Sequence, residues 1–102
     1  MGKVIELTYN GKTYTLEFNR RILATMSKDK ELQEETYDSM IKYVWYAFQK
    51  NHSDITYQQV IEITDEIGDL TGFVNALKEI TESAINTLNN GSEGNAKWGV
   101  KN

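Results

Sequence analysis

The sequence contains no cysteine and no proline, and it has a single histidine among its 102 residues. Without cysteine the chain can form no disulfide, thiolate nucleophile or cysteine-ligated zinc site, and this lack fits a reducing compartment. No apolar run approaches the ~18 residues of a membrane-spanning helix, and the N-terminus lacks the hydrophobic region of a signal peptide. We therefore expect neither membrane insertion nor secretion.

What is present is the composition of one small globular domain. Hydrophobic residues make up 39% of the chain and charged residues 25%, which argues against global disorder. A chain of this length is too short to bury two separate cores. We expect a single globular domain over residues 1–88. The Asn-, Gly- and Ser-rich residues 89–102 have the composition of a flexible tail.

Charge is distributed unevenly along the chain, whose net charge is −4. Residues 1–30 hold six basic against three acidic residues, a net +3, and residues 31–102 hold five lysines against twelve acids, a net −7. The acidic balance argues against general nucleic-acid binding, which needs a dense basic face. This separation of charge suggests that the basic N-terminal part of one copy attracts the acidic remainder of another copy. The plainer alternative is a solvated surface on which the charges are separated by chance.

The N-terminal segment has the clearest structural signal. Residues 4–18 alternate in polarity on either side of Asn10-Gly11, a dipeptide that accepts the positive φ angles of a type I′ turn. A two-residue loop sets the register and pairs Leu7 with Tyr14. We therefore predict a β-hairpin with one apolar face, which must cover helices or another chain because an isolated hairpin is only marginally stable.

After the hairpin, apolar residues recur at helical spacing, and the predicted fold class is α+β, mostly α. The three to four expected helices span about 20–27, 32–50, 57–67 and 70–88. Thr56 and Gln59 match a capping box at the start of the third helix. Gly68 and Asp69 favour a break between the last two helices over one bent helix.

Residues that could carry catalysis or hold a metal are few. His52 follows a helix, where capping of the last carbonyls or exposure to solvent explains it. Glu62, Asp65, Glu66 and Asp69 form an acidic stripe on the outer side of the third predicted helix. A straight helix presents such ligands in a row rather than around an ion. No glycine-rich phosphate-binding motif is present. We expect no enzymatic activity, no cofactor and no metal site.

Surface features that core packing does not require are candidates for partner binding. Aromatic residues and arginine are common anchors of protein interfaces. Tyr46 is expected on the polar side of its helix, and Trp98 is isolated in the polar tail. Each of these could also be incidentally exposed. The candidate partner-binding residues are Arg20, Arg21, Tyr46, Glu62, Asp65, Glu66, Asp69 and Trp98.

The N-terminal segment resembles the start of tail assembly chaperones from long-tailed bacteriophages, especially those that infect Gram-positive hosts. The residues that carry the resemblance are Asn10, Gly11, Lys12, Tyr14, Leu16 and Phe18, followed by Arg20 and Arg21. About 20 residues carry this specific match. The helical remainder, the acidic balance and the polar tail also suit such a protein.

The resemblance implies a non-catalytic phage or prophage protein that acts in the host cytoplasm and is absent from the mature virion. Such chaperones bind the tape measure protein, keep it soluble during tail assembly and help to recruit the tail tube protein. The resemblance also implies a longer, frameshifted product whose extension would begin within residues 89–102. Subunits that join head to tail would form an open assembly rather than a closed pair.

The residues leave two other classes of function open. One is a small protein-binding adaptor or regulatory domain of phage or bacterial origin, acting as a monomer or dimer. The other is a nucleic-acid binder that uses Arg20, Arg21, Lys28 and Lys30. We rank the nucleic-acid binder last, because acidic residues follow at once and no recognition helix is evident.

Overall fold

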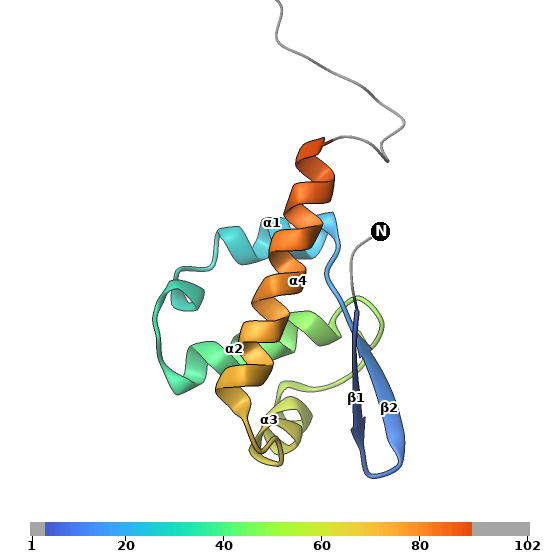
Figure 1. The fold of residues 1–102 in the computed structure, drawn as a ribbon. Helices are drawn as coiled ribbons and strands as arrows, with labels where there is room; N and C mark the ends of the chain where they lie inside the picture. The colour runs from blue at the N-terminus through green and yellow to red at the C-terminus, as the bar shows by residue number, and fades with distance from the viewer. Residues whose placement is uncertain (1–3, 91–102) are drawn as a thin grey trace, which may run out of the picture.

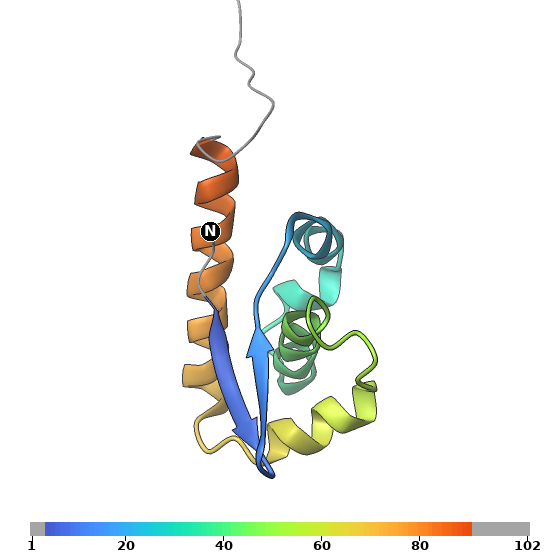
Figure 2. The ribbon, with the colours of Figure 1, turned by 90° about the vertical axis from the view of Figure 1, so that its right-hand side faces the viewer.

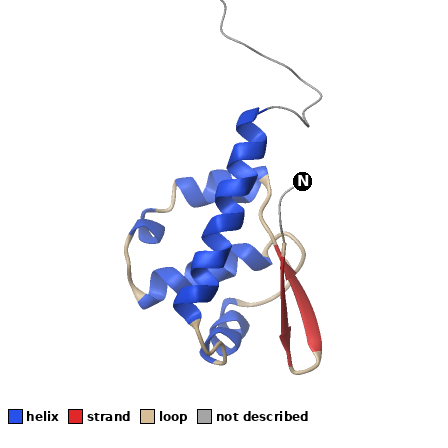
Figure 3. Ribbon diagram, viewed as in Figure 1, coloured by secondary structure: helices blue, strands red, loops and turns tan. Residues whose placement is uncertain are grey.

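The computed structural model describes residues 4–90 of the chain, with their side chains as far as Glu82. The described residues form an N-terminal hairpin followed by a series of helices, as Figures 1 and 3 show. The elements are β1 (Ile5–Tyr9), β2 (Lys12–Leu16), α1 (Arg20–Ser27), η1 (Lys30–Gln33), α2 (Tyr37–Phe48), α3 (Tyr57–Asp65) and α4 (Leu70–Asn90). The predicted α+β, mostly α, fold class is confirmed. Among the described residues, no helix is long and apolar enough to cross a membrane.

The hairpin has the predicted turn and register. Asn10 and Gly11 have φ angles of 50° and 77°, the left-handed region that a type I′ turn needs at both central positions. Glycine adopts it freely and asparagine tolerates it better than most residues. Leu7 pairs with Tyr14 in the antiparallel ladder. The local turn chemistry therefore places all apolar residues of both strands on one face.

The outer edge of β2 is covered by the C-terminal end of α2 and the loop that follows it. The Glu17 N–H donates to the Ala47 carbonyl at 3.3 Å. The Thr15 N–H donates to His52 Nε2 at 3.1 Å, and the Thr15 carbonyl accepts from Asn51 Nδ2 at 3.1 Å. The expected capping or solvent-exposed role of the His52 side chain is therefore wrong, because the folded hairpin brings a backbone donor to its imidazole.

One hydrophobic core joins the hairpin to the helices. Figure 2 looks onto the hairpin, which lies across the junction of α4 with α2. Phe48 is fully buried, and its ring meets the Tyr14 ring edge-on at a centroid distance of 5.3 Å. The buried apolar residues among those described are Leu16, Phe18, Ile22, Met26, Ile41, Val44, Ala47, Phe48, Val60, Ile63, Val74, Leu77 and Ile80. Every helix except η1 contributes to this set, so the core holds the described part of the chain together.

The predicted helix over 32–50 is wrong at its start. Asp29 Oδ1 accepts from the Glu31 N–H at 3.1 Å and begins η1, a separate short helix. Thr36 then begins α2, because its Oγ1 accepts from the Ser39 N–H at 3.1 Å while Ser39 Oγ accepts from the Thr36 N–H at 3.2 Å. The intervening Glu34 is extended. Two polar caps in succession therefore divide a segment that periodicity alone treats as one helix.

Two side chains of α2 lie on faces that the periodicity does not predict. Helical periodicity puts Tyr37 in the apolar arc of α2 and Ser39 on the opposite, polar side. In the structure Tyr37 is 48% exposed, whereas Ser39 is 6% exposed. Ser39 is buried because its Oγ donates to the Glu34 carbonyl as well as closing the capping box. The start of α2 is thus oriented by polar contacts rather than by its apolar stripe.

The predicted break between the last two helices is confirmed. α3 begins with the expected capping box, in which Thr56 Oγ1 accepts from the Gln59 N–H at 3.1 Å. It ends at Asp65, two residues before the predicted end. Asp69 begins α4, since its Oδ1 accepts from the Gly72 N–H at 3.1 Å. α4 continues to Asn90, into the predicted tail, and residues 91–102 lie outside the described residues.

Candidate functional site

The basic end of the molecule is formed by α1. Asn19 Oδ1 accepts from the Ile22 N–H at 2.8 Å and caps the helix, and the buried Ile22 and Met26 face the core. Arg20 and Arg21 are exposed in the first turn. Cations at a helix N-terminus oppose the macrodipole, so helix formation itself does not favour them. The positive charges of both arginines therefore lie at the surface, where solvent or a partner can contact them.

The acidic stripe lies around the turn from α3 into α4. Glu62 and Asp65 belong to α3, Glu66 is its C-cap residue and Asp69 is the first capping residue of α4. The prediction that all four line one helix face is therefore wrong, because α3 ends early, although all four are exposed. The Tyr37 hydroxyl donates to Asp65 Oδ1 at 2.7 Å, and this bond raises the tyrosine pKa. In the described part of the chain, no three His, Cys, Asp or Glu side chains converge as metal ligands.

The tertiary structure places the two charged groups far apart. In both Figure 1 and Figure 2, α2 lies between α1 and α3. The pair Arg20 and Arg21 is consequently on one side of the fold and the acidic stripe is on the other. In this arrangement the two arginines of one copy can contact the acidic stripe of a second copy.

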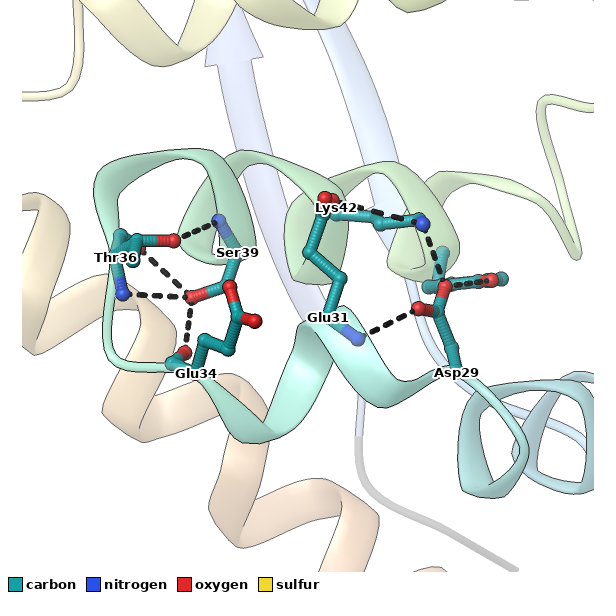
Figure 4. Close-up of polar contacts among 7 residues, drawn as sticks. Asp29, Glu31, Glu34, Thr36, Ser39 and Lys42 are labelled. Atoms are coloured by element: carbon teal, nitrogen blue, oxygen red, sulfur yellow. Dashed lines mark hydrogen bonds and ion pairs between the residues drawn. The ribbon is translucent and has the colours of Figure 1, made fainter.

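Tyr46 belongs to a polar cluster that joins the start of η1 to α2. Figure 4 shows Asp29, Glu31 and Lys42 of this cluster. Its hydroxyl donates to Asp29 Oδ2 at 2.7 Å, and Lys42 Nζ lies 2.8 Å from the same oxygen. Lys42 Nζ is also 3.6 Å from Glu31 Oε1. The Asp29 side chain is 13% exposed and Tyr46 is half-buried. The expectation that Tyr46 is an exposed aromatic residue is therefore wrong, because Asp29 folds back onto it.

Hydrogen bonds to the Asp29 carboxylate set the electrostatics of this cluster. The bond from Lys42, and after it the bond from Tyr46, lower the pKa of Asp29, and the same contact raises the pKa of Lys42. A carboxyl whose pKa is lowered by folding stabilises the fold above its ordinary pKa. That stabilisation is lost as the pH falls through the lowered pKa. The cluster therefore holds η1 to α2 at neutral pH.

A groove with a volume of about 430 Å³ lies between α4, α2 and the segment that connects η1 to α2. We call it the α2–α4 groove. Leu32, Met40 and Tyr43 are half-buried beside it, and Val74 is buried. The residues that line it are Leu32, Gln33, Glu34, Glu35, Ser39, Met40, Tyr43, Thr71, Val74, Asn75 and Lys78. The groove leaves no signal in the sequence, because its walls come from three separate segments of the chain.

Tyr43 fixes the wall that α2 and α4 share. Its hydroxyl donates to Thr81 Oγ1 at 2.8 Å, and the Thr81 hydroxyl donates to the Leu77 carbonyl at 3.0 Å. Burial of the phenol raises the pKa of Tyr43. Its ring also meets the Phe18 ring edge-on at a centroid distance of 5.9 Å. The aromatic side of the groove is thus anchored to both the hairpin segment and α4.

The predicted partner-binding residues do not converge on one site. The arginines, the acidic stripe and Tyr46 lie on different parts of the fold, and Trp98 lies outside the described residues. No curated protein and no solved structure matches this chain. A family profile with the description "Domain of unknown function (DUF5055)" matches residues 1–102. The match spans the sequence, so the chain belongs to the DUF5055 family.

Proposed function

We propose that this protein is a tail assembly chaperone of a long-tailed bacteriophage or prophage. It binds the tape measure protein, keeps it soluble, helps to recruit the tail tube protein and leaves before the virion is complete. It acts in the host cytoplasm and without catalysis. The observation that supports this proposal most is the N-terminal unit, in which the residues of the resemblance occupy one hairpin and the start of the helix after it.

Each part of that unit has a physical role. Asn10 and Gly11 form the turn, and Leu16 and Phe18 are buried in the core. Arg20 then presents charge at the surface immediately after the buried residues. The resemblance therefore involves residues that orient a basic end on a stable scaffold, which suits a protein that acts through its folded surface.

Co-expression with the tape measure protein tests the chaperone function. We expect this protein to raise the soluble fraction of the tape measure protein encoded in the same genome. The matched control is a long helical protein of similar length from an unrelated source, whose solubility should not change. An unchanged soluble fraction of the tape measure protein would instead support a small adaptor or regulatory domain.

Head-to-tail self-association is part of the same proposal and rests on the separated charges. We expect light scattering to show a mass that rises with protein concentration and falls with added salt, which screens exposed charges. Arg20→Glu with Arg21→Glu, and separately Glu62→Lys with Glu66→Lys, should each reduce the association. Mixing the two variants should restore it, because each supplies one native end.

The control for this experiment reverses acidic residues elsewhere. Glu79 and Glu82 are exposed on α4. Glu79→Lys with Glu82→Lys changes the net charge as much as the α3 variant does, yet should leave the association intact. A constant monomeric mass for the unmodified protein at every concentration and salt level would exclude head-to-tail assembly.

A further inference from the structure

The α2–α4 groove has an apolar wall and an acidic rim, and one segment of this chain has the complementary chemistry. We propose that the groove binds residues 97–101 of the same chain, with Trp98 against the apolar wall. This inference does not depend on the proposed function in tail assembly. It assigns the groove a ligand class: an extended peptide with an aromatic residue between lysines.

The apolar part of the match comes from alternation. Residues 97–101 read Lys-Trp-Gly-Val-Lys, so an extended segment places Trp98 and Val100 on one side and both lysines on the other. The groove offers the half-buried Leu32 and Met40 and the ring of Tyr43 as a wall for that apolar side. A volume of about 430 Å³ leaves room for one indole ring with a smaller side chain beside it.

The charges determine how the segment would lie. Glu34 and Glu35 are exposed on the rim formed by the connection from η1 to α2, and Lys78 is exposed on the α4 side. The two glutamates attract Lys97 and Lys101, whereas Lys78 repels them. The segment is therefore expected to lie with its lysines over the connection rather than over α4.

The length of chain beyond α4 permits this contact within one molecule. Twelve residues separate Lys78 from Asn90 on α4, a distance of about 18 Å at the helical rise of ~1.5 Å per residue. Trp98 is eight residues beyond Asn90, and an extended chain of that length spans about 26–29 Å. The segment can thus return along α4 to the level of Lys78 with some length to spare.

Methyl NMR of the full-length chain tests this proposal without changing the described fold. Met40 lines the groove, whereas Met26 is buried in the core and serves as an internal control. We expect the Met40 methyl resonance to be shifted by the ring current of Trp98. Trp98→Ala should remove that shift and leave the Met26 resonance unchanged. Identical Met40 shifts in the two proteins would overturn the proposal.

Two further measurements distinguish binding of residues 97–101 from binding of another occupant in the groove. Glu34→Lys with Glu35→Lys should move the Met40 resonance toward its position in the Trp98→Ala protein, whereas the control Glu62→Lys with Glu66→Lys should not. The Met40 shift should also be independent of dilution. A shift that disappears on dilution would mean that the groove binds a second copy, which contradicts binding within one chain.

Discussion

Replacing Phe48 with alanine is expected to lower the free energy of unfolding by about 3–5 kcal/mol. Phe48 is fully buried between the hairpin and the helices, and its ring contacts the rings of Tyr14 and His52. The substitution removes buried apolar surface and leaves a cavity that these neighbours fill only in part. Because a small domain has a total stability of roughly 5–15 kcal/mol, this variant is expected to be close to unfolding.

Urea denaturation followed by circular dichroism measures this effect. Phe73→Ala on α4 is the matched control, since it removes the same ring from a half-buried position. The loss at Phe73 should be clearly smaller than the loss at Phe48. Equal losses of stability at the two positions would show that the full burial of Phe48 does not make its ring more important than that of Phe73.

Replacing His52 with alanine is expected to cost about 1–3 kcal/mol, the usual penalty for a polar group left without its partner. The His52 imidazole accepts the Thr15 N–H at 3.1 Å and meets the Tyr14 ring edge-on at 5.0 Å. Without it, the backbone of residues 15–17 keeps its contacts to Asn51 and to the Ala47 carbonyl, and the Glu17 side chain keeps its ion pair with Lys50. The hairpin should therefore separate more readily from α2.

Amide hydrogen exchange at Thr15 measures this local effect directly. Exchange should become faster in His52→Ala relative to the Leu16 amide, which belongs to the ladder between the strands. His52→Gln offers a side-chain oxygen as an alternative acceptor and should retain part of the protection. Unchanged exchange at Thr15 in the alanine variant would show that the imidazole does not tie β2 to α2.

Local chemistry explains the predictions that the structure confirms. Asn10-Gly11 determines the register of the hairpin because few other dipeptides accept two positive φ angles. Thr56 caps α3 as predicted, through a side chain that lies three residues from the amide it accepts, and Asn19 caps α1 in the same way. Such contacts need no information from distant parts of the chain.

The errors in the predicted helices have an equally local origin. Asp29 and Thr36 each begin a helix through the capping contacts of their side chains. Hydrophobic periodicity describes only the spacing of apolar residues, so it does not locate these two starts. The exposure of Tyr37 and the burial of Ser39 follow from the capping contacts of Thr36 and Ser39. These contacts stabilise the start of α2 more than burial of the Tyr37 ring would.

The sequence by itself determined the fold class, the hairpin register, the break before α4 and the exposure of the two charged groups. These depend on turn chemistry, caps and periodicity, all of which act over a few residues. Only the tertiary structure decided that the charged groups lie on opposite sides of α2, that Asp29 meets Lys42 and Tyr46, and that a groove opens beside α4. Those features join segments distant in sequence, and their positions depend on how helices pack around one shared core.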